Sequence, residues 1–254
     1  MAATEAARDW LADYHRLLAR HRLDPTTVLT DAVDQTAPQR PALLSLAQIL
    51  EQPDRLHHQL TSEHPDSTEP RLRRARMSVL HQSLALQVIA PAVIRLFRDG
   101  VGTALDPERI FLCQPEADGG CRWREVAGSP DRLKPGRFIE SLAHQVQTWY
   151  PVFRQSFSIS PGAYWSSTGL ALGAPYSAVW DRVTPSDLCP QASGWLQQFD
   201  CEAGKYIDWI SARFNQHPCA LPQRRGCCLK YLLPDEGYCG TCGVYRKERM
   251  TTVI

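Results

Sequence analysis

Four of the nine cysteines fall within one short segment and have the spacing of a metal centre. Cys227 and Cys228 are adjacent, ten residues follow them, and two residues separate Cys239 from Cys242. A two-residue spacing lets one turn direct two thiolates at the same metal centre, and Gly240 is expected to relieve crowding of the backbone there. These four side chains are therefore the strongest candidates in the chain for holding a metal.

The spacing of the four thiols favours an iron–sulfur cluster over zinc and leaves zinc open. Both groups take tetrahedral sulfur at each metal atom. Zinc knuckles usually present their ligands from two CxxC-like turns. Adjacent cysteines tend to point in opposite directions, which suits two metal atoms better than one.

The other five cysteines are expected to be small apolar residues of the core, without a metal. An odd number of cysteines cannot all form disulfides, and a reducing compartment disfavours disulfides altogether. Cys219 is close enough in sequence to the four thiols to replace Cys227 or Cys228 if either is lost. The residues of this group are Cys113, Cys121, Cys189, Cys201 and Cys219.

Charge and composition exclude several classes of protein. The 254 residues carry 28 Lys and Arg against 27 Asp and Glu, so a net charge of +1 provides no field that would hold nucleic acid. With 43% hydrophobic residues, a chain of this length buries a full core without disulfides. No basic segment followed by an apolar one opens the sequence, so we expect a cytoplasmic protein. Association with the cytoplasmic face of the inner membrane is the alternative.

The most apolar segment, Val79–Phe97, is long enough to span a bilayer but is predicted to be a core helix. It contains polar side chains such as His81, Gln87 and Arg95, and each of them would be costly in hydrocarbon. Pro91 lies inside the segment, so the helix is expected to be kinked there.

Apolar residues at helical spacing predict several further helices. Ser160 and Pro161 have the residue types of an N-cap and a first helical turn. Helices are expected over residues 5–22, 42–50, 138–150 with Pro151 at the end, 161 to about Arg182, and in one or two short pieces within 195–214. Two β-like runs, 110–114 and 121–126, flank a Gly-rich turn and predict a hairpin.

These elements predict an α+β fold that is predominantly α-helical, with a short β-hairpin and a small C-terminal iron–sulfur segment. A mainly helical domain is expected over residues 1–215. The cluster-binding segment is expected over residues 216–254, where the cysteines gather.

The cysteine segment resembles a known family. Arg224–Asp235, followed by Cys239–Cys242, is similar to the C-terminal signature of the ferric-siderophore reductases of the FhuF type, both in spacing and in the flanking residues. A second segment, Tyr164–Gly169, resembles a Trp-Ser-Asn-Thr-Gly segment of the same family. Ser167 stands where that family usually has asparagine, so this chain lacks the amide.

The resemblance implies a cofactor and an activity. In that family four cysteines hold a [2Fe–2S] cluster, which assigns Cys227, Cys228, Cys239 and Cys242 as ligands. The implied enzyme reduces siderophore-bound Fe(III) to Fe(II) and releases the iron in the cytoplasm, because hard oxygen donors bind Fe(II) far less tightly. The alternatives are an iron–sulfur sensor and a zinc-stabilised interaction module without redox activity.

The implied partners are a ferric siderophore and a separate electron-donor protein of the flavodoxin or ferredoxin type. No Gly-rich phosphate loop or GxGxxG pattern is present, so direct binding of NAD(P)H or flavin is not expected. Trp165 and Tyr164 are candidates for contact with the siderophore, since aromatic faces pack well on chelate backbones. Packing in the core is the alternative interpretation of these two aromatic residues.

Three cations, Arg224, Arg225 and Lys230, lie beside the proposed ligands in sequence. Positive charge close to an anionic cluster favours its more negative reduced form. The same side chains would suit the docking of an acidic electron donor. Solvated cations without a role in the chemistry are the simpler alternative.

Overall fold

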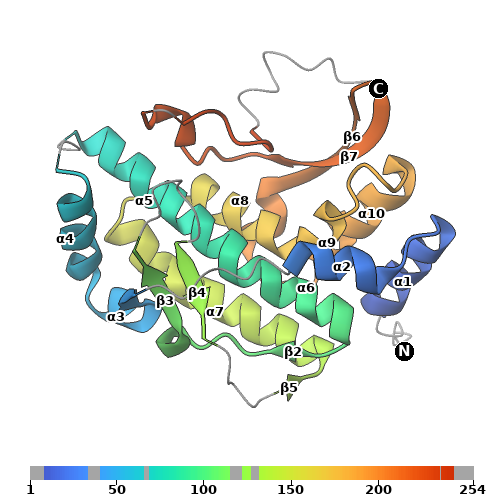
Figure 1. Cartoon of the computed structure of the whole chain (residues 1–254), viewed down its shortest axis with the longest axis horizontal. Coiled ribbons are helices and arrows are strands. Elements are labelled where there is room, and N and C mark those ends of the chain that lie inside the picture. The colour runs from blue at the N-terminus through green and yellow to red at the C-terminus, as the bar shows by residue number, and fades with distance from the viewer. Residues whose placement is uncertain are drawn as a thin grey trace, which may run out of the picture.

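The computed structural model describes residues 9–33, 41–65, 69–114, 122–126, 132–234 and 236–242. Figure 1 shows long helices at the centre, short strands beside them, and a long C-terminal hairpin above them in this view. The helices are α1 (Trp10–Arg20), α2 (Pro25–Val33), α3 (Leu46–Glu51), α4 (Pro53–Glu63), α5 (Pro70–Leu84), α6 (Ala90–Asp99), α7 (Pro135–Gln155), α8 (Pro161–Leu172), α9 (Ala174–Ser177) and α10 (Pro185–Leu196).

The strands form small antiparallel sheets, so the predicted, mainly helical α+β class is confirmed. β1, β3 and β4 form one sheet, while β2 pairs with β5 and β6 with β7. The strands are β1 (Ala42–Ser45), β2 (Gly102–Thr103), β3 (Ile110–Cys113), β4 (Trp123–Glu125), β5 (Arg132–Leu133), β6 (Ile207–Phe214) and β7 (His217–Arg224).

One helical rod runs from Pro70 to Asp99 as α5, the π-helical turn η1 (Ala85–Ile89) and α6. Pro91 explains the π turn, because proline lacks the N–H that would bond to the carbonyl of Gln87 and its ring crowds that carbonyl. By length and composition the rod could cross a membrane, yet 72% of its apolar 18-residue window is buried inside the molecule. The predicted core helix is confirmed, and it begins before Val79.

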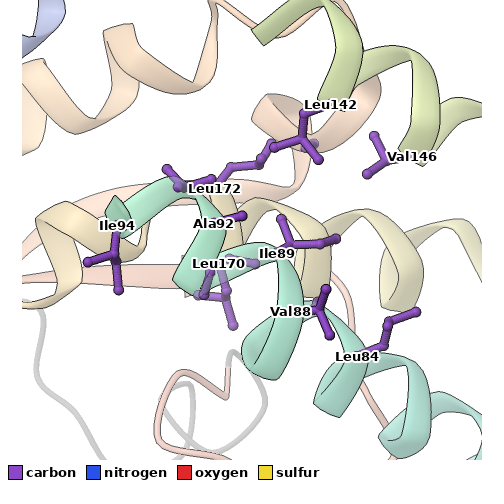
Figure 2. Close-up of a cluster of buried hydrophobic side chains, with 14 of the residues drawn as sticks. Leu84, Val88, Ile89, Ala92, Ile94, Leu142, Val146, Leu170 and Leu172 are labelled. Carbon is purple, nitrogen blue, oxygen red and sulfur yellow. The ribbon is translucent and has the colours of Figure 1, made fainter. Parts of the chain in front are cut away.

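The core forms where this rod packs against α7 and α8 (Figure 2). Each large apolar side chain buried in this way contributes about 1.5–3 kcal/mol relative to its exposed state. α8 is buried on every side, because η3 (Glu202–Tyr206) and β6 pack on it as well as the rod. The side chains labelled in Figure 2 are Leu84, Val88, Ile89, Ala92 and Ile94 of the rod, Leu142 and Val146 of α7, and Leu170 and Leu172 of α8.

The expectation of a helix over residues 42–50 is wrong for its first half. Ala42–Ser45 is a strand that pairs with β3, so tertiary pairing overrides the local helical spacing. Ser45 then begins α3 with a capping box: its hydroxyl accepts from the N–H of Gln48 (3.1 Å), and the Gln48 side chain accepts from the N–H of Ser45 (3.0 Å). The predicted hairpin is confirmed by the pairing of β3 with β4; its turn at 118–120 lies outside the described residues.

Two predicted helices end elsewhere than expected. α7 continues past Pro151, because a proline near the end of a helix removes only one backbone hydrogen bond. α8 begins as predicted, with the Ser160 hydroxyl accepting a backbone N–H three residues ahead (3.2 Å). It ends at Leu172 instead of near Arg182, since Gly173 favours a break in the helix.

The β6–β7 hairpin corrects the expectation of short helices within residues 195–214. That range holds the end of α10 and η3, but Ile207–Phe214 is a strand. Asn215 and Gln216 both have positive φ (48° and 67°), as in a two-residue turn whose twist matches that of the flanking strands. The register places Arg224 opposite the first residue of β6. The boundary predicted after residue 215 falls inside this turn, and the division into two parts stays a prediction.

Candidate metal centre

The four cysteines lie in the segment that follows β7 and crosses α5 (Figure 1). Cys228 and Cys242 are buried, and Cys227 and Cys239 are half-buried. The sulfurs of Cys228 and Cys239 lie 3.8 Å apart and share a hydrogen bond. Cys227 Sγ accepts from the backbone N–H of Leu229 (3.4 Å). The N–H of Cys242 bonds to the carbonyl of Cys239 (2.9 Å) and closes the CxxC turn.

The surroundings shift the pKa values of three of these thiols in different directions. The hydrogen bond with Cys239 lowers the pKa of Cys228 to about 6, and the positive charge of Arg224 acts in the same direction against the effect of burial. The same bond and burial raise the pKa of Cys239, and burial raises the pKa of Cys227. The thiolate of Cys228 is thus favoured near neutral pH, and metal binding must displace protons from Cys227 and Cys239.

Arg224 is a buried cation beside the thiols, with 3% of its surface exposed. Its guanidinium donates to the hydroxyls of Ser166 (Nε–Oγ, 2.9 Å) and Ser167 (Nη2–Oγ, 2.8 Å) and to the carbonyl of Ala163 (Nη2–O, 3.3 Å). The remaining nitrogen, Nη1, is buried and has no hydrogen-bond partner in the described part of the chain. A buried cation held only by neutral oxygen atoms is costly, so a negative group beside it is stabilised.

α8 also packs against the backbone that precedes the four cysteines. Gly162 of α8 and Gly226 pack backbone against backbone, and a Cβ on Gly226 would lie 1.9 Å from the carbonyl oxygen of Gly162. The Ser166 hydroxyl donates to the carbonyl of Gly226 (3.4 Å) while it accepts from Arg224. Gly240, which was expected to relieve crowding, has open space around it. The glycine that must lack a side chain is therefore Gly226.

The comparison with known protein families falls on this same segment. Residues 224–242 match the family of the FhuF 2Fe-2S C-terminal domain. This segment is a FhuF-type domain. Its cofactor is a [2Fe–2S] cluster, as the sequence resemblance implied. No curated protein and no solved structure matches the chain.

The residues of the FhuF-type domain fit that cofactor. Two thiolates at each iron would use the four cysteines of this segment, and a cluster held by thiolates is anionic. Such a cluster would supply negative charge beside Arg224, whose Nη1 is a donor without a partner among the described residues. Among the described residues no three His, Cys, Asp or Glu side chains converge on one point, as a mononuclear metal site would require, whereas a [2Fe–2S] cluster needs only two thiolates at each iron.

The other two predicted cations of the FhuF-type domain have different environments. Arg225 is exposed and pairs with Asp208 (Nε–Oδ2, 2.6 Å). Lys230 is half-buried and pairs with Glu236 (Nζ–Oε2, 2.7 Å). Ion pairs open to solvent contribute little and are screened by salt. Arg224 is thus buried, whereas Arg225 and Lys230 form ion pairs that reach solvent. The roles of the three cations in tuning the cluster or in docking an electron donor stay predictions.

Tyr164 and Trp165 lie in the core of the molecule, beneath the FhuF-type domain. Their exposed fractions are 1% and 3%, and the Tyr164 hydroxyl donates to the carbonyl of Val146 (2.7 Å). This placement agrees with core packing; contact with a siderophore stays a prediction. Ser166 and Ser167, which hold Arg224, were not singled out by type or spacing. Their signal lay only in the resemblance of the segment Tyr164–Gly169 to the family.

The cysteines outside the FhuF-type domain show no sign of metal binding where they are described. Burial raises the pKa of Cys189 to about 11, with the nearby Cys219 adding to the effect. Cys219 is buried in β7 opposite Ala212, about 16 Å along the strand from Arg224. The hairpin would have to open before Cys219 could replace a ligand. Cys121 lies outside the described residues.

His81 of α5 gives a prediction about acid stability. Its buried ring stacks on Tyr164 with centroids 4.2 Å apart, and burial, assisted by the charge of Arg224, lowers its pKa from 6.5 to about 3. The folded state keeps His81 neutral while the unfolded chain gains a proton below pH 6.5. The free energy of unfolding should therefore fall by about 1.4 kcal/mol for each pH unit below 6.5.

Urea unfolding of the wild type and of His81→Phe, at about pH 7.5 and about pH 5.5, measures this contribution. The variant keeps an aromatic ring against Tyr164 but has no group that titrates. Its free energy of unfolding should depend less on pH than that of the wild type. An equal dependence in both proteins would contradict a neutral, buried His81.

Proposed function

We propose that the chain is a ferric-siderophore reductase. The observation that carries the proposal is the FhuF-type domain itself, a [2Fe–2S] segment at residues 224–242 whose first residue, Arg224, is a buried cation. When bound, a [2Fe–2S] cluster supplies one-electron chemistry. Each chelated Fe(III) takes up one electron to become Fe(II), and this electron transfer requires no covalent bond to form or break.

Reduction releases the iron because it changes the hardness of the metal. Fe(III) is a hard cation held by hard oxygen donors, and Fe(II) is softer and carries less charge. The residues of this chain would position the ferric complex close to the cysteine segment. Arg224 would stabilise the additional negative charge that arrives with the electron.

The electron comes, in this proposal, from a separate one-electron donor protein of the flavodoxin or ferredoxin type. Each donor molecule loses one electron for each Fe(III) reduced. The exposed Arg225 supports a docking surface for an acidic donor of this kind. The proposed location is the cytoplasm, with the cytoplasmic face of the inner membrane as the alternative; burial of the apolar helix Pro70–Asp99 in the core is consistent with both.

Anaerobic absorption spectroscopy tests the function. Purified protein should be reddish-brown, bleach on reduction by dithionite, and recover its colour when a ferric siderophore is added, while a chelator captures Fe(II). Cys228→Ser, which removes a buried ligand, should lack the visible bands and the reaction. Colourless wild type with one zinc per chain would overturn the proposal. A coloured protein that no ferric complex reoxidises would favour the iron–sulfur sensor instead.

A further inference from the structure

A cavity of about 660 Å³ lies between α4, α5 and the FhuF-type domain. Its volume is in the range of sites that bind small molecules. Cys239 and Gly240 form part of its wall, so a molecule bound here would touch one of the residues that hold the cluster. Ser83 of α5 and Leu86 of η1 belong to the facing wall.

Positive side chains gather around this cavity. Arg76, Arg122 and Lys230 line it, whereas Glu236 is the single carboxylate among its described lining residues. Lys230 pairs with Glu236 (2.7 Å), and Arg122 pairs with Glu63 just outside the lining (3.1 Å). Even with Glu63 included, cations outnumber carboxylates, which favours a negatively charged ligand.

The charge of Arg76 also affects the pKa of a neighbouring histidine. His64 also lines the cavity, and burial together with the charge of Arg76 lowers its pKa. A neutral His64 adds no charge of its own near pH 7. With His64 neutral, the described residues that line the cavity carry three cations, two of which are paired with Glu236 and Glu63.

Two exposed apolar side chains are among the residues that line the cavity. Leu86 and Tyr238 line it and are 43% and 44% exposed, and they belong to the few large hydrophobic side chains that the described chain exposes. Exposed apolar side chains that gather at a cavity indicate a ligand with apolar parts of its own. Cations and exposed apolar groups that line the same cavity together suit an anionic metal complex wrapped in an organic framework.

We infer that this cavity binds the ferric chelate and that it prefers chelates with a net negative charge to neutral ones. The inference rests on the proposed function and deepens it by naming the site and the class of substrate. The wall formed by Cys239 and Gly240 places the iron complex against the cluster-binding segment without intervening protein.

Binding of redox-inert gallium(III) complexes tests the site without relying on electron transfer. The probes are the trianionic gallium complex of a tricatecholate and the neutral gallium complex of a trihydroxamate, titrated calorimetrically into the cluster-loaded protein. The wild type should bind the trianionic complex at least about tenfold more tightly. Ser83→Trp, which fills the cavity, should weaken binding of both complexes at least about tenfold.

Two further variants distinguish the loss of a binding site from a general change in folding. Ser186→Trp adds the same indole at an exposed position of α10 and should bind both complexes like the wild type. Arg76→Glu should weaken binding of the trianionic complex while leaving the neutral complex nearly unchanged. Because the neutral complex acts as an internal control, a general loss of structure cannot produce that difference.

The outcomes test the inferred binding site and the proposed reductase function separately. Unchanged binding in Ser83→Trp, or equal affinity of the wild type for both complexes, would overturn the inferred site or its preference. If ferric complexes reoxidise the wild type and Ser83→Trp equally well, the function stands and the cavity is the wrong site. If the gallium complex binds as described but no ferric complex is reduced, the cavity stands and the reductase function fails.

Discussion

Replacing Arg224 by methionine is expected to lower the reduction potential of the cluster by about 40–90 mV. Methionine fills a similar volume but has no charge. In a site with an effective dielectric constant of about 20, loss of one nearby unit charge costs the more negative reduced state about 1–2 kcal/mol, and about 1.4 kcal/mol corresponds to 59 mV for one electron. The direction follows from the sign of the lost charge, and the size of the effect follows from the buried position of Arg224, where water screens it little.

The same substitution is expected to weaken the fold of the segment. Ser166 and Ser167 would each lose a charge-assisted hydrogen bond from the guanidinium, and these oxygen atoms are buried. Buried polar atoms left without partners cost about 1–3 kcal/mol each, and this cost falls mainly on Ser167, because the Ser166 hydroxyl still donates to the carbonyl of Gly226. Arg224→Lys should shift the potential less than Arg224→Met, because it keeps the charge, although it cannot donate to both serines in the same fork geometry.

Arg225→Met is the matched control for the potential. Arg225 is the neighbouring residue, but it is exposed and paired with Asp208, so solvent and salt screen its charge. Anaerobic redox titrations followed by visible absorption should show a lower potential for Arg224→Met and an unchanged one for Arg225→Met. Equal potentials in all three proteins would show that Arg224 does not tune the cluster.

Local sequence patterns predicted the features that depend on neighbours in the chain. The four cysteines lie within one segment, so their spacing was enough to indicate a metal centre. Pro91 marked the irregularity in the central helix, and Ser160 marked the start of α8, because helix breaks and caps are set by adjacent residues.

Features that depend on distant pairing could not be predicted in this way. Arg224 has the sequence context of a solvated cation, but α8 supplies its partners from 57 to 61 positions away. Residues 42–45 are apolar enough for a helix, yet they pair with β3, far along the chain. The walls of the cavity come from α4, α5 and the FhuF-type domain, so no single stretch of sequence contained it.

Replacing Gly226 by alanine is expected to displace the cysteine segment and lower the iron content of the purified protein. A Cβ at this position would lie 1.9 Å from the carbonyl oxygen and 2.1 Å from the carbonyl carbon of Gly162. Both are backbone atoms of a buried helix, so neither can move aside as the end of a flexible side chain would. Overpacking of this kind costs about 1–3 kcal/mol, and more where the backbone itself must shift.

Gly237→Ala is the matched control for this steric argument. It lies in the same segment between the two pairs of cysteines, and no atom comes within 4 Å of the Cβ that it would add. Iron per chain and the unfolding midpoint should therefore fall in Gly226→Ala and stay near wild type in Gly237→Ala. In the wild type, the close packing of Gly226 on Gly162 holds the backbone just before Cys227. A wild-type iron content in Gly226→Ala would therefore mean that α8 does not determine where the ligands lie.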